Sequence, residues 1–303
     1  SNFLNGYSYI LCDAIELNKP YLKNFAKYSK NITKVSMPHG SDFPFTKKFK
    51  GPKKNQLGYN FKIILFSKTK GEKDYYQTIL KLKNNNYLRS GNPKHDKKWI
   101  NFIQKKNKNN SNTISENKRY IFIVSRHADQ IYFTNKNKIR ALTMIKEIIM
   151  EKKNINVIIK PHPKENLYEY YFKIFGKDLY NVKWKFSYDH QYIVSKNAFC
   201  SITFFSGVAT DMNILGIPNI EIINLKEVTE NIAKKDLFFK NNIPMFRIRY
   251  HDLTLGADDE TEFGKLIEMI TKNKRKVMMN LRKNYNKNYI NSDSTKKIMK
   301  IIK

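Results

Sequence analysis

The chain has 303 residues, of which 41% are hydrophobic and 14% aromatic, and its formal net charge at pH 7 is +31. This composition excludes an intrinsically disordered chain, and the length leaves room for two domains with full cores. No segment approaches the roughly 20 consecutive apolar residues that a membrane-spanning helix needs. The first residues lack the charged start and long apolar stretch of a signal peptide, so we expect a cytoplasmic protein.

The positive charge comes mainly from lysine, and Asn, Ile, Tyr and Phe are also abundant. These residue types share AT-rich codons, so part of the charge reflects genome composition. Arginine, which forks onto bases and phosphates, is scarce, and this disfavours nucleic acid as a partner. A peripheral contact with the anionic inner face of the plasma membrane, or an anionic glycan or lipid-linked acceptor, fits the charge better.

The first part of the chain predicts a small α/β domain. Strands are expected at 7–15, 32–40 and 62–68, a helix at 71–83, and a strand end, a Gly-Asn-Pro turn and a helix within 87–106. Residues 105–118 are rich in Lys, Asn and Ser and show no apolar period, which predicts an interdomain linker. We therefore expect one domain at 1–108 and a second at 109–303.

Strands and helices alternate more regularly in the second domain. Strands are expected at 119–126, 155–163, 182–189, 198–207 and 217–223, and helices at 138–153, 166–176, 190–197, 208–215 and, rich in lysine, 265–303. This alternation predicts a parallel sheet covered by helices on both faces. Ligands bind such sheets outside the carboxyl ends of the strands, so polar residues at strand ends are the candidate site.

His162 stands between two prolines where the strand at 155–163 ends, with Lys160 and Lys164 on either side. The prolines restrict the backbone, and an imidazole held there can donate a hydrogen bond to a leaving phosphate. Lys160 is a second candidate donor-binding residue. The alternative is a rigid turn between a strand and a helix, with no ligand.

Ser206 and Gly207 end another apolar strand, and Thr210 and Asp211 follow in the first turn of the next helix. A hydroxyl beside the free N–H groups of a helix N-terminus suits a phosphate. Asp211 either binds ribose hydroxyls or only favours the helix dipole, as an ordinary capping residue does.

Arg126 closes the strand at 119–126, where a cation would face the same crevice; the alternative is a solvated strand end. His39 and Gly40 follow a short strand in the first domain, which makes His39 a candidate general base for an acceptor hydroxyl. Asp42 is a second candidate base, and both remain open. Neither a metal nor a cofactor is expected, because the chain has no His/Cys/carboxylate cluster with metal-site spacing and no glycine-rich nucleotide motif.

The order of these motifs resembles that of GT-B transferases that build bacterial surface polymers. The motifs are MPHG (37–40), SGNPKHD (90–96), FIVSRH (122–127), IIKPHP (158–163) and FFSGVATDMNILGIP (204–218). CDP-glycerol glycerophosphotransferases of teichoic acid synthesis show a similar order, and capsule transferases that use CMP-Kdo or CMP-sialic acid share the Lys-Pro-His-Pro segment. UDP-GlcNAc 2-epimerases share the fold, a His-Pro pair and a Ser-Gly-Gly motif. The resemblance spans roughly residues 8–225, with Ser-Gly where many transferases have Ser-Ser.

This resemblance implies a GT-B-like α/β fold, in which two Rossmann-type domains face each other across a cleft. It implies that His39 faces the acceptor, and that His162 and Ser206 hold the donor phosphates. The implied activity is metal-independent transfer of a sugar or glycerol-phosphate unit from a CMP-, CDP- or UDP-linked donor to a surface polysaccharide, lipopolysaccharide or teichoic-acid-like acceptor. The alternatives are a UDP-sugar 2-epimerase-like enzyme and a non-catalytic module of polymer assembly. The first domain is short for a full Rossmann domain, so it is either compact or preceded by further sequence.

Overall fold

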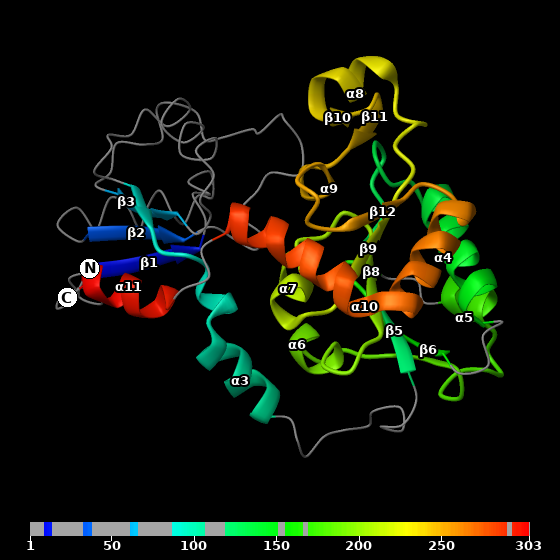
Figure 1. The fold of residues 1–303 in the computed structure, drawn as a ribbon, viewed down its shortest axis with the longest axis horizontal. Coiled ribbons are helices and arrows are strands. Elements are labelled where there is room, and N and C mark those ends of the chain that lie inside the picture. Colours follow the sequence, from blue (N-terminus) through cyan, green and yellow to red (C-terminus); the bar gives the residue numbers. More distant parts are fainter. Residues whose placement is uncertain are drawn as a thin grey trace. The chain divides into compact units, whose positions relative to one another are not determined.

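The computed structural model describes residues 9–13, 33–37, 61–65, 87–106, 119–150, 155–165, 169–289 and 293–302. These segments form two compact units (Figure 1). The first unit comprises the described residues up to Trp99 together with those from Asn286 onward, and the second extends from Ile100 to Tyr285. The predicted boundary between residues 108 and 109 lies outside the described residues and stays a prediction, as does most of the linker expected at 105–118.

The first unit contains a parallel sheet whose described strands follow one another in chain order. They are β1 (Tyr9–Asp13), β2 (Thr33–Met37), β3 (Phe61–Leu65) and β4 (Tyr87–Arg89). Each strand overlaps a segment that the sequence predicts as extended, and β3 begins one residue before its predicted start at residue 62. A short 3-10 helix, η4 (Pro93–His95), and helix α3 (Lys97–Lys106) follow β4, whereas the helix predicted at 71–83 lies outside the described residues.

Asp96 joins the end of the chain to the segment that follows β4. Its carboxylate accepts hydrogen bonds from the backbone N–H groups of Ser294 and Thr295, each at 2.8 Å, and from the Thr295 hydroxyl at 2.6 Å. These contacts satisfy the free N–H groups at the start of helix α11 (Ser294–Ile302). The sequence predicts residues 286–303 as part of the C-terminal domain, but the structure groups the described residues of this segment with the first unit.

The second unit is built on a larger parallel sheet. Its strands are β5 (Arg119–Val124), β6 (Ile155–Lys160), β7 (Trp184–Phe186), β8 (Cys200–Thr203), β9 (Asn219–Ile222) and β12 (Leu255–Ala257). Their spatial order is β12-β9-β8-β5-β6-β7. The chain adds β6 and β7 on one side of β5, and then β8, β9 and β12 on its other side. Doubly wound Rossmann-type sheets have this order, and the point where it reverses lies here between β5 and β8.

Helices cover this sheet, as the alternating pattern predicts (Figure 1). They are α4 (Asn135–Met150), α5 (Glu169–Phe175), α6 (Gln191–Val194), α7 (Val208–Leu215) and α10 (Glu260–Asn288). Strands β5 and β6 are buried along almost their whole length, which is why they read as continuous apolar runs. Helix α7 matches its predicted bounds and ends at Gly216, whose φ of 76° is the left-handed conformation common at helix ends.

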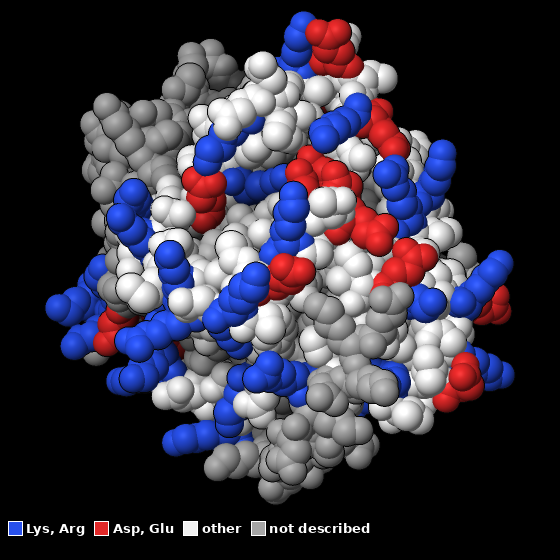
Figure 2. Space-filling model, turned by 45° about the vertical axis from the view of Figure 1, so that its right-hand side comes forward, with Lys and Arg blue, Asp and Glu red and all other residues white. Residues whose placement is uncertain are grey.

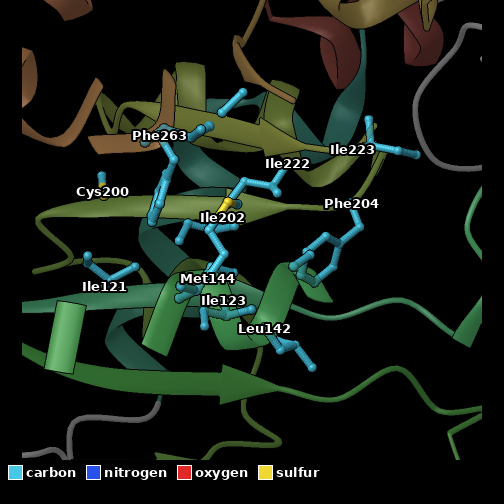
Figure 3. Close-up of a cluster of buried hydrophobic side chains, with 14 of the residues drawn as sticks. Ile121, Ile123, Leu142, Met144, Cys200, Ile202, Phe204, Ile222, Ile223 and Phe263 are labelled. Carbon is cyan, nitrogen blue, oxygen red and sulfur yellow. The ribbon is translucent and has the colours of Figure 1, made fainter. Parts of the chain in front are cut away.

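Side chains that point to one face of the sheet form the main core (Figure 3). The labelled members that are fully buried or nearly so come from β5, β8, β9, α4 and α10: Ile121, Ile123, Cys200, Ile202, Ile222, Leu142, Met144 and Phe263. Phe204, the first residue after β8, packs on Phe133 with 4.9 Å between ring centroids. The core therefore extends to the carboxyl ends of the central strands and holds the following loops in place.

The segment between β9 and α10 contains elements that the sequence analysis did not predict. They are α8 (Glu230–Asp236), β10 (Phe238–Lys240), β11 (Ile243–Met245), α9 (Arg247–Tyr250) and the edge strand β12. Asn241 and Asn242, with φ values of 51° and 62°, form the two-residue turn of the β10–β11 hairpin. The helix expected at 265–303 is instead α10, with non-helical backbone at Asn273, followed by α11.

Basic side chains cover much of the visible face, with acidic side chains among them (Figure 2). The basic side chains on this face are therefore spread over it and not gathered in one patch. Among the residues that the structure describes, no helix combines the length and the hydropathy required to cross a bilayer.

Candidate functional site

Three neighbouring strands bring the predicted donor-binding residues to one edge of the sheet. Strand β5 ends directly before Ser125 and Arg126, β6 ends before Pro161 and His162, and β8 ends three residues before Ser206. Because β5 pairs in parallel with both β6 and β8, their carboxyl ends lie side by side. This edge includes the point where the strand order reverses, which is where α/β sheets bind ligands.

The rings of His127 and His162 lie against each other at this edge, with 4.6 Å between their centroids. Burial lowers the pKa of both imidazoles, and nearby positive charges lower it further: chiefly Arg126 for His127, and His127 and then Arg126 for His162. Because the ordinary pKa of histidine is about 6.5, both rings are neutral at physiological pH. A neutral imidazole can donate one hydrogen bond and accept another.

The proton of His162 is placed by its own turn. The backbone N–H of Lys164 donates to Nδ1 of His162 at 3.1 Å, so Nδ1 acts as an acceptor. The neutral ring therefore carries its proton on Nε2, which is then a hydrogen-bond donor. This is the form that the predicted contact with a leaving phosphate requires.

Arg126 occupies the reversal point between β5 and β8. Its guanidinium carbon lies 3.7 Å from the centroid of the Phe205 ring, a cation–π contact across the two strand ends. Burial lowers the pKa of Arg126, but an arginine stays charged at any physiological pH. The prediction that Arg126 adds a cation at this edge fits its position.

Phe205 is a feature of the site that the sequence analysis missed. Its φ of 44° is a rare conformation for a bulky residue, and the strand-to-helix turn holds it there. The ring stacks on Phe246 with 4.5 Å between centroids, lies edge-on to the Phe133 ring at 6.2 Å and also contacts Arg126. The double phenylalanine before the Ser-Gly pair was the available signal, but the sequence alone does not indicate the backbone conformation.

Ser206 and Gly207 form the turn from β8 into α7. The Ser206 hydroxyl accepts a hydrogen bond from the backbone N–H of Val208 at 3.3 Å, and its own proton is still available to a ligand. Gly207 is the N-cap of α7 and supplies no side-chain cap. Any residue can adopt its φ of −59°, so the backbone conformation does not require a glycine here. What Gly207 contributes is the absence of a side chain.

Thr210 and Asp211 are buried, and the contacts found for both are internal. The Thr210 hydroxyl donates to the Gly207 carbonyl at 2.7 Å, which closes the first turn of α7. The Asp211 carboxylate accepts from the side-chain amide of Gln191 at 3.3 Å. Burial raises the pKa of Tyr192, and the charge of Asp211 raises it further. These positions fit support of the turn better than direct contact with a ligand.

Lys160, at the end of β6, holds the loop that follows β7. Its ammonium group donates to the carbonyl oxygens of Tyr188 at 3.1 Å and Asp189 at 2.7 Å. Burial lowers its pKa. Lys160 thus stabilises the rim of the site through these bonds and has limited capacity left for a ligand. His39 and Asp42, the predicted bases, lie outside the described residues.

No protein-family model matches the chain. No curated protein matches it either. The fold, by contrast, is shared with solved structures, among them ones determined with UDP, CDPG or UDP-GlcNAc.

One similar structure is a UDP-GlcNAc 2-epimerase from Neisseria meningitidis bound to UDP-GlcNAc, with a TM-score of 0.62, 12% identity, and coverage of 97% of this chain and 76% of that one. Another is S. aureus MnaA with UDP, with a TM-score of 0.60, 11% identity, and coverage of 96% and 72%. A third is the wall teichoic acid polymerase TagF, with a TM-score of 0.59, 14% identity, and coverage of 97% and 72%. These similarities show that the chain has the GT-B-type α/β fold that its motifs predict.

Proposed function

We propose that the protein is an enzyme that binds a nucleotide-linked donor at the carboxyl ends of β5, β6 and β8. The observation that carries the proposal is the convergence, at the edge of the sheet that contains its reversal point, of three different groups that are able to bind a phosphate. Arg126 supplies a cation, His162 an N–H donor, and Ser206 a hydroxyl beside the N-terminus of α7. Such donors stabilise the negative charge that develops on a leaving phosphate.

The proposed reaction is transfer of a sugar or glycerol-phosphate unit from a CMP-, CDP- or UDP-linked donor to a surface polysaccharide or teichoic-acid-like acceptor. His39 or Asp42 would remove the proton of the acceptor hydroxyl, and His162 would donate to the leaving phosphate. Arg126 would offset the phosphate charge without a metal ion. TagF, a polymerase of wall teichoic acid solved with CDPG, supports this choice of reaction class.

The second candidate is a UDP-sugar 2-epimerase-like enzyme, because epimerases with UDP or UDP-GlcNAc bound share the fold. The two activities differ in their need for an acceptor. An epimerase converts the donor alone, whereas a transferase releases little nucleotide until an acceptor hydroxyl is added. A protein that binds no nucleotide at all would instead be a module of polymer assembly, with acceptor glycan or anionic membrane as its partner.

A thermal-shift screen with CMP, CDP, UMP and UDP tests the donor site first. A ligand at 100 times its dissociation constant adds about 2.7 kcal/mol to the free energy of unfolding, which raises the midpoint measurably. Replacing Arg126 with Ala should abolish the shift. The matched control is Arg119→Ala, because Arg119 stands at the opposite end of the same strand. An equal loss of the thermal shift in Arg126→Ala and Arg119→Ala would contradict the proposed site. If no nucleotide shifted the wild type, the non-catalytic alternative would remain.

A further inference from the structure

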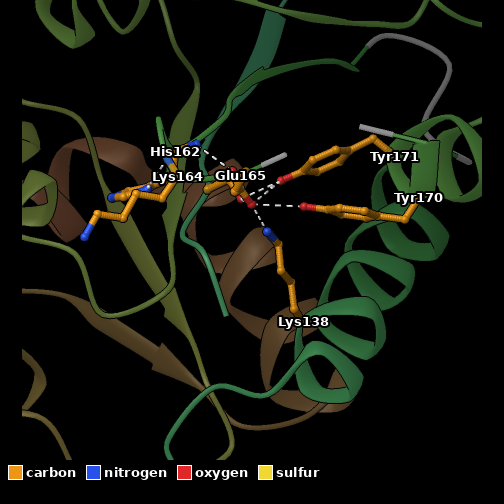
Figure 4. A network of polar contacts seen from close by, with 7 residues as sticks. Lys138, His162, Lys164, Glu165, Tyr170 and Tyr171 are labelled. Atoms are coloured by element: carbon orange, nitrogen blue, oxygen red, sulfur yellow. Dashed lines mark hydrogen bonds and ion pairs between the residues drawn. The ribbon is translucent and has the colours of Figure 1, made fainter. Parts of the chain in front are cut away.

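A buried carboxylate lies beneath the His162 turn (Figure 4). The side chains of Glu165 and its ion-pair partner Lys138, on α4, are only 3% and 4% exposed. Glu165 draws hydrogen bonds from the end of β5, from its own turn and from α5; the donors are Ser125, His162, Tyr170 and Tyr171. The contact with His162 is made by its backbone N–H, so its ring stays available for the proposed reaction.

The two oxygens of the Glu165 carboxylate serve different parts of this network. Oε1 accepts from the hydroxyls of Ser125 at 2.9 Å, Tyr170 at 3.0 Å and Tyr171 at 3.2 Å, and it contacts the Lys138 ammonium. Oε2 accepts from the backbone N–H of His162 at 2.5 Å. One oxygen therefore fixes Glu165 to the protein interior, and the other fixes the His162 backbone to Glu165.

The same turn also sets the state of the His162 ring. The Glu165 backbone N–H donates to the His162 carbonyl at 2.9 Å, so the turn is closed by these two residues in both directions. Lys164 lies inside the closed turn, and its N–H reaches Nδ1 of His162 only because the turn keeps this shape. If the turn opened, Nδ1 would lose its donor, and the ring proton could move between the two nitrogens.

We propose that Glu165 is a positioning residue that fixes the His162 turn, so that the ring keeps its proton on Nε2 and presents that N–H to the donor phosphate. The functional part of this inference rests on the proposed role of His162, while the effect on the ring proton does not. Lys138 has a separate task, which is to balance the buried charge. Burial lowers the pKa of Lys138 to about 7, and its amino group contacts the Glu165 carboxylate.

Removing Glu165 alone would leave an uncompensated lysine in the interior, so the test removes both charges at once. In Lys138→Met with Glu165→Gln, the amide keeps an oxygen that can accept from the His162 N–H. In Lys138→Met with Glu165→Leu, a side chain of similar size has no acceptor. The two double variants differ in the hydrogen bond to the turn and share the loss of the buried charges.

Nitrogen NMR of histidine-labelled protein reports which ring nitrogen carries the proton, without any ligand. We expect the Gln variant to keep the wild-type signature of His162, and the Leu variant to show a mixture of the two neutral forms. Calorimetry with CDP or UDP should show an affinity about 10-fold weaker for the Leu variant than for the Gln variant, as loss of one well-placed charge-assisted hydrogen bond implies.

An unchanged signature in the Leu variant, or equal changes in both double variants, would overturn the proposal. If the signatures separate as expected but neither nucleotide binds the wild type, the proposed function fails and the positioning role stands. Should the Leu variant not fold, Glu165→Asp replaces it, since the shorter side chain keeps the charge but draws the carboxylate back from the turn. A wild-type His162 signature in the Asp variant would equally overturn the proposal.

Discussion

His127 and His162 follow different strands, yet their rings meet at the site with 4.6 Å between centroids. Neither sequence neighbourhood would bring two imidazoles together; the parallel pairing of β5 with β6 does. Two protonated rings at this distance would repel each other, and Arg126 and Lys164 add further positive charge. The pair is therefore stable as neutral rings and sensitive to acid.

The first prediction concerns this sensitivity to pH. Because the folded-state pKa of both rings is lowered, the unfolded chain binds more protons in mildly acidic solution. The stabilisation is fully present above the unfolded pKa of about 6.5 and is lost as the pH falls through the lower folded values. Urea unfolding of the wild type should therefore show a lower midpoint at pH 5.5 than at pH 7.5.

The double variant His127→Gln with His162→Gln should show a smaller difference between these two pH values. His251, whose pKa burial also lowers, remains in both proteins and provides a common background. An identical pH dependence in wild type and double variant would exclude the histidine pair as a source of acid sensitivity.

The second prediction concerns His162 as the donor to the leaving phosphate. His162→Ala removes the Nε2 proton from the site and should slow transfer by roughly 10²- to 10³-fold, as loss of such a donor does in other enzymes. The flanking prolines should keep the turn, so the circular dichroism spectrum should stay that of the wild type.

His190→Ala is the comparison for this effect. His190 also follows a strand of the sheet, but its ring accepts a hydrogen bond from the backbone N–H of Tyr192 and caps α6. Its loss should cost about 1 kcal/mol of stability and leave turnover largely intact. A near-normal rate for His162→Ala would refute the phosphate role.

The third prediction separates the contact of the Phe205 ring with Arg126 from the general contribution of a buried phenylalanine to stability. Phe205→Leu removes the ring under Arg126, and the lost cation–π contact is worth about 0.5–2 kcal/mol, or roughly a 2- to 30-fold loss of nucleotide affinity. Phe204→Leu is the control, because Phe204 is equally buried but stacks on Phe133. Both variants should lower the free energy of unfolding, and only Phe205→Leu should weaken binding measured by calorimetry. If Phe205→Leu bound the nucleotide as tightly as the wild type, Arg126 would not need the Phe205 ring to bind it.

Much of the second unit could be predicted from the sequence, because neighbouring residues determine many of its strands and helix ends. Buried parallel strands such as β5 read as apolar runs, and α7 begins after a Ser-Gly pair and ends at a glycine. The strand-end positions of Arg126, His162 and Ser206 followed from the same pattern. The fold class is confirmed, and the donor-binding role of these residues stays a prediction.

Other features depend on contacts between segments that are distant in the sequence, and a local sequence pattern does not predict such contacts. The elements between β9 and α10 are short, and tertiary packing decides their form, as it does for the edge strand β12. Asp96 and Ser294 meet although they are 198 positions apart in the sequence, so the sequence pattern places the last helix in the other domain. The internal contacts of Thr210 and Asp211 were hidden for the same reason: a polar residue in a first helical turn reads alike whether it faces a ligand or Gln191.

The last prediction concerns the general base. If His39 takes the proton of the acceptor hydroxyl, His39→Ala should lower turnover by about 10²- to 10⁴-fold. Nucleotide affinity should stay almost unchanged, because the proposed phosphate-binding groups lie in the second unit and His39 precedes it in the chain. Steady-state kinetics and calorimetry on the same variant measure the two quantities independently.

Asp42→Asn decides between the two candidate bases, since Asp42 is close enough in sequence to act in place of His39. Loss of transfer in Asp42→Asn, together with near-normal transfer in His39→Ala, would assign the base to Asp42. A weakening of nucleotide binding in His39→Ala as large as that in His162→Ala would instead make His39 a ligand of the donor. Only a fall in turnover at constant affinity fits removal of the acceptor proton, because a general base acts in the transition state and contributes nothing to holding the nucleotide.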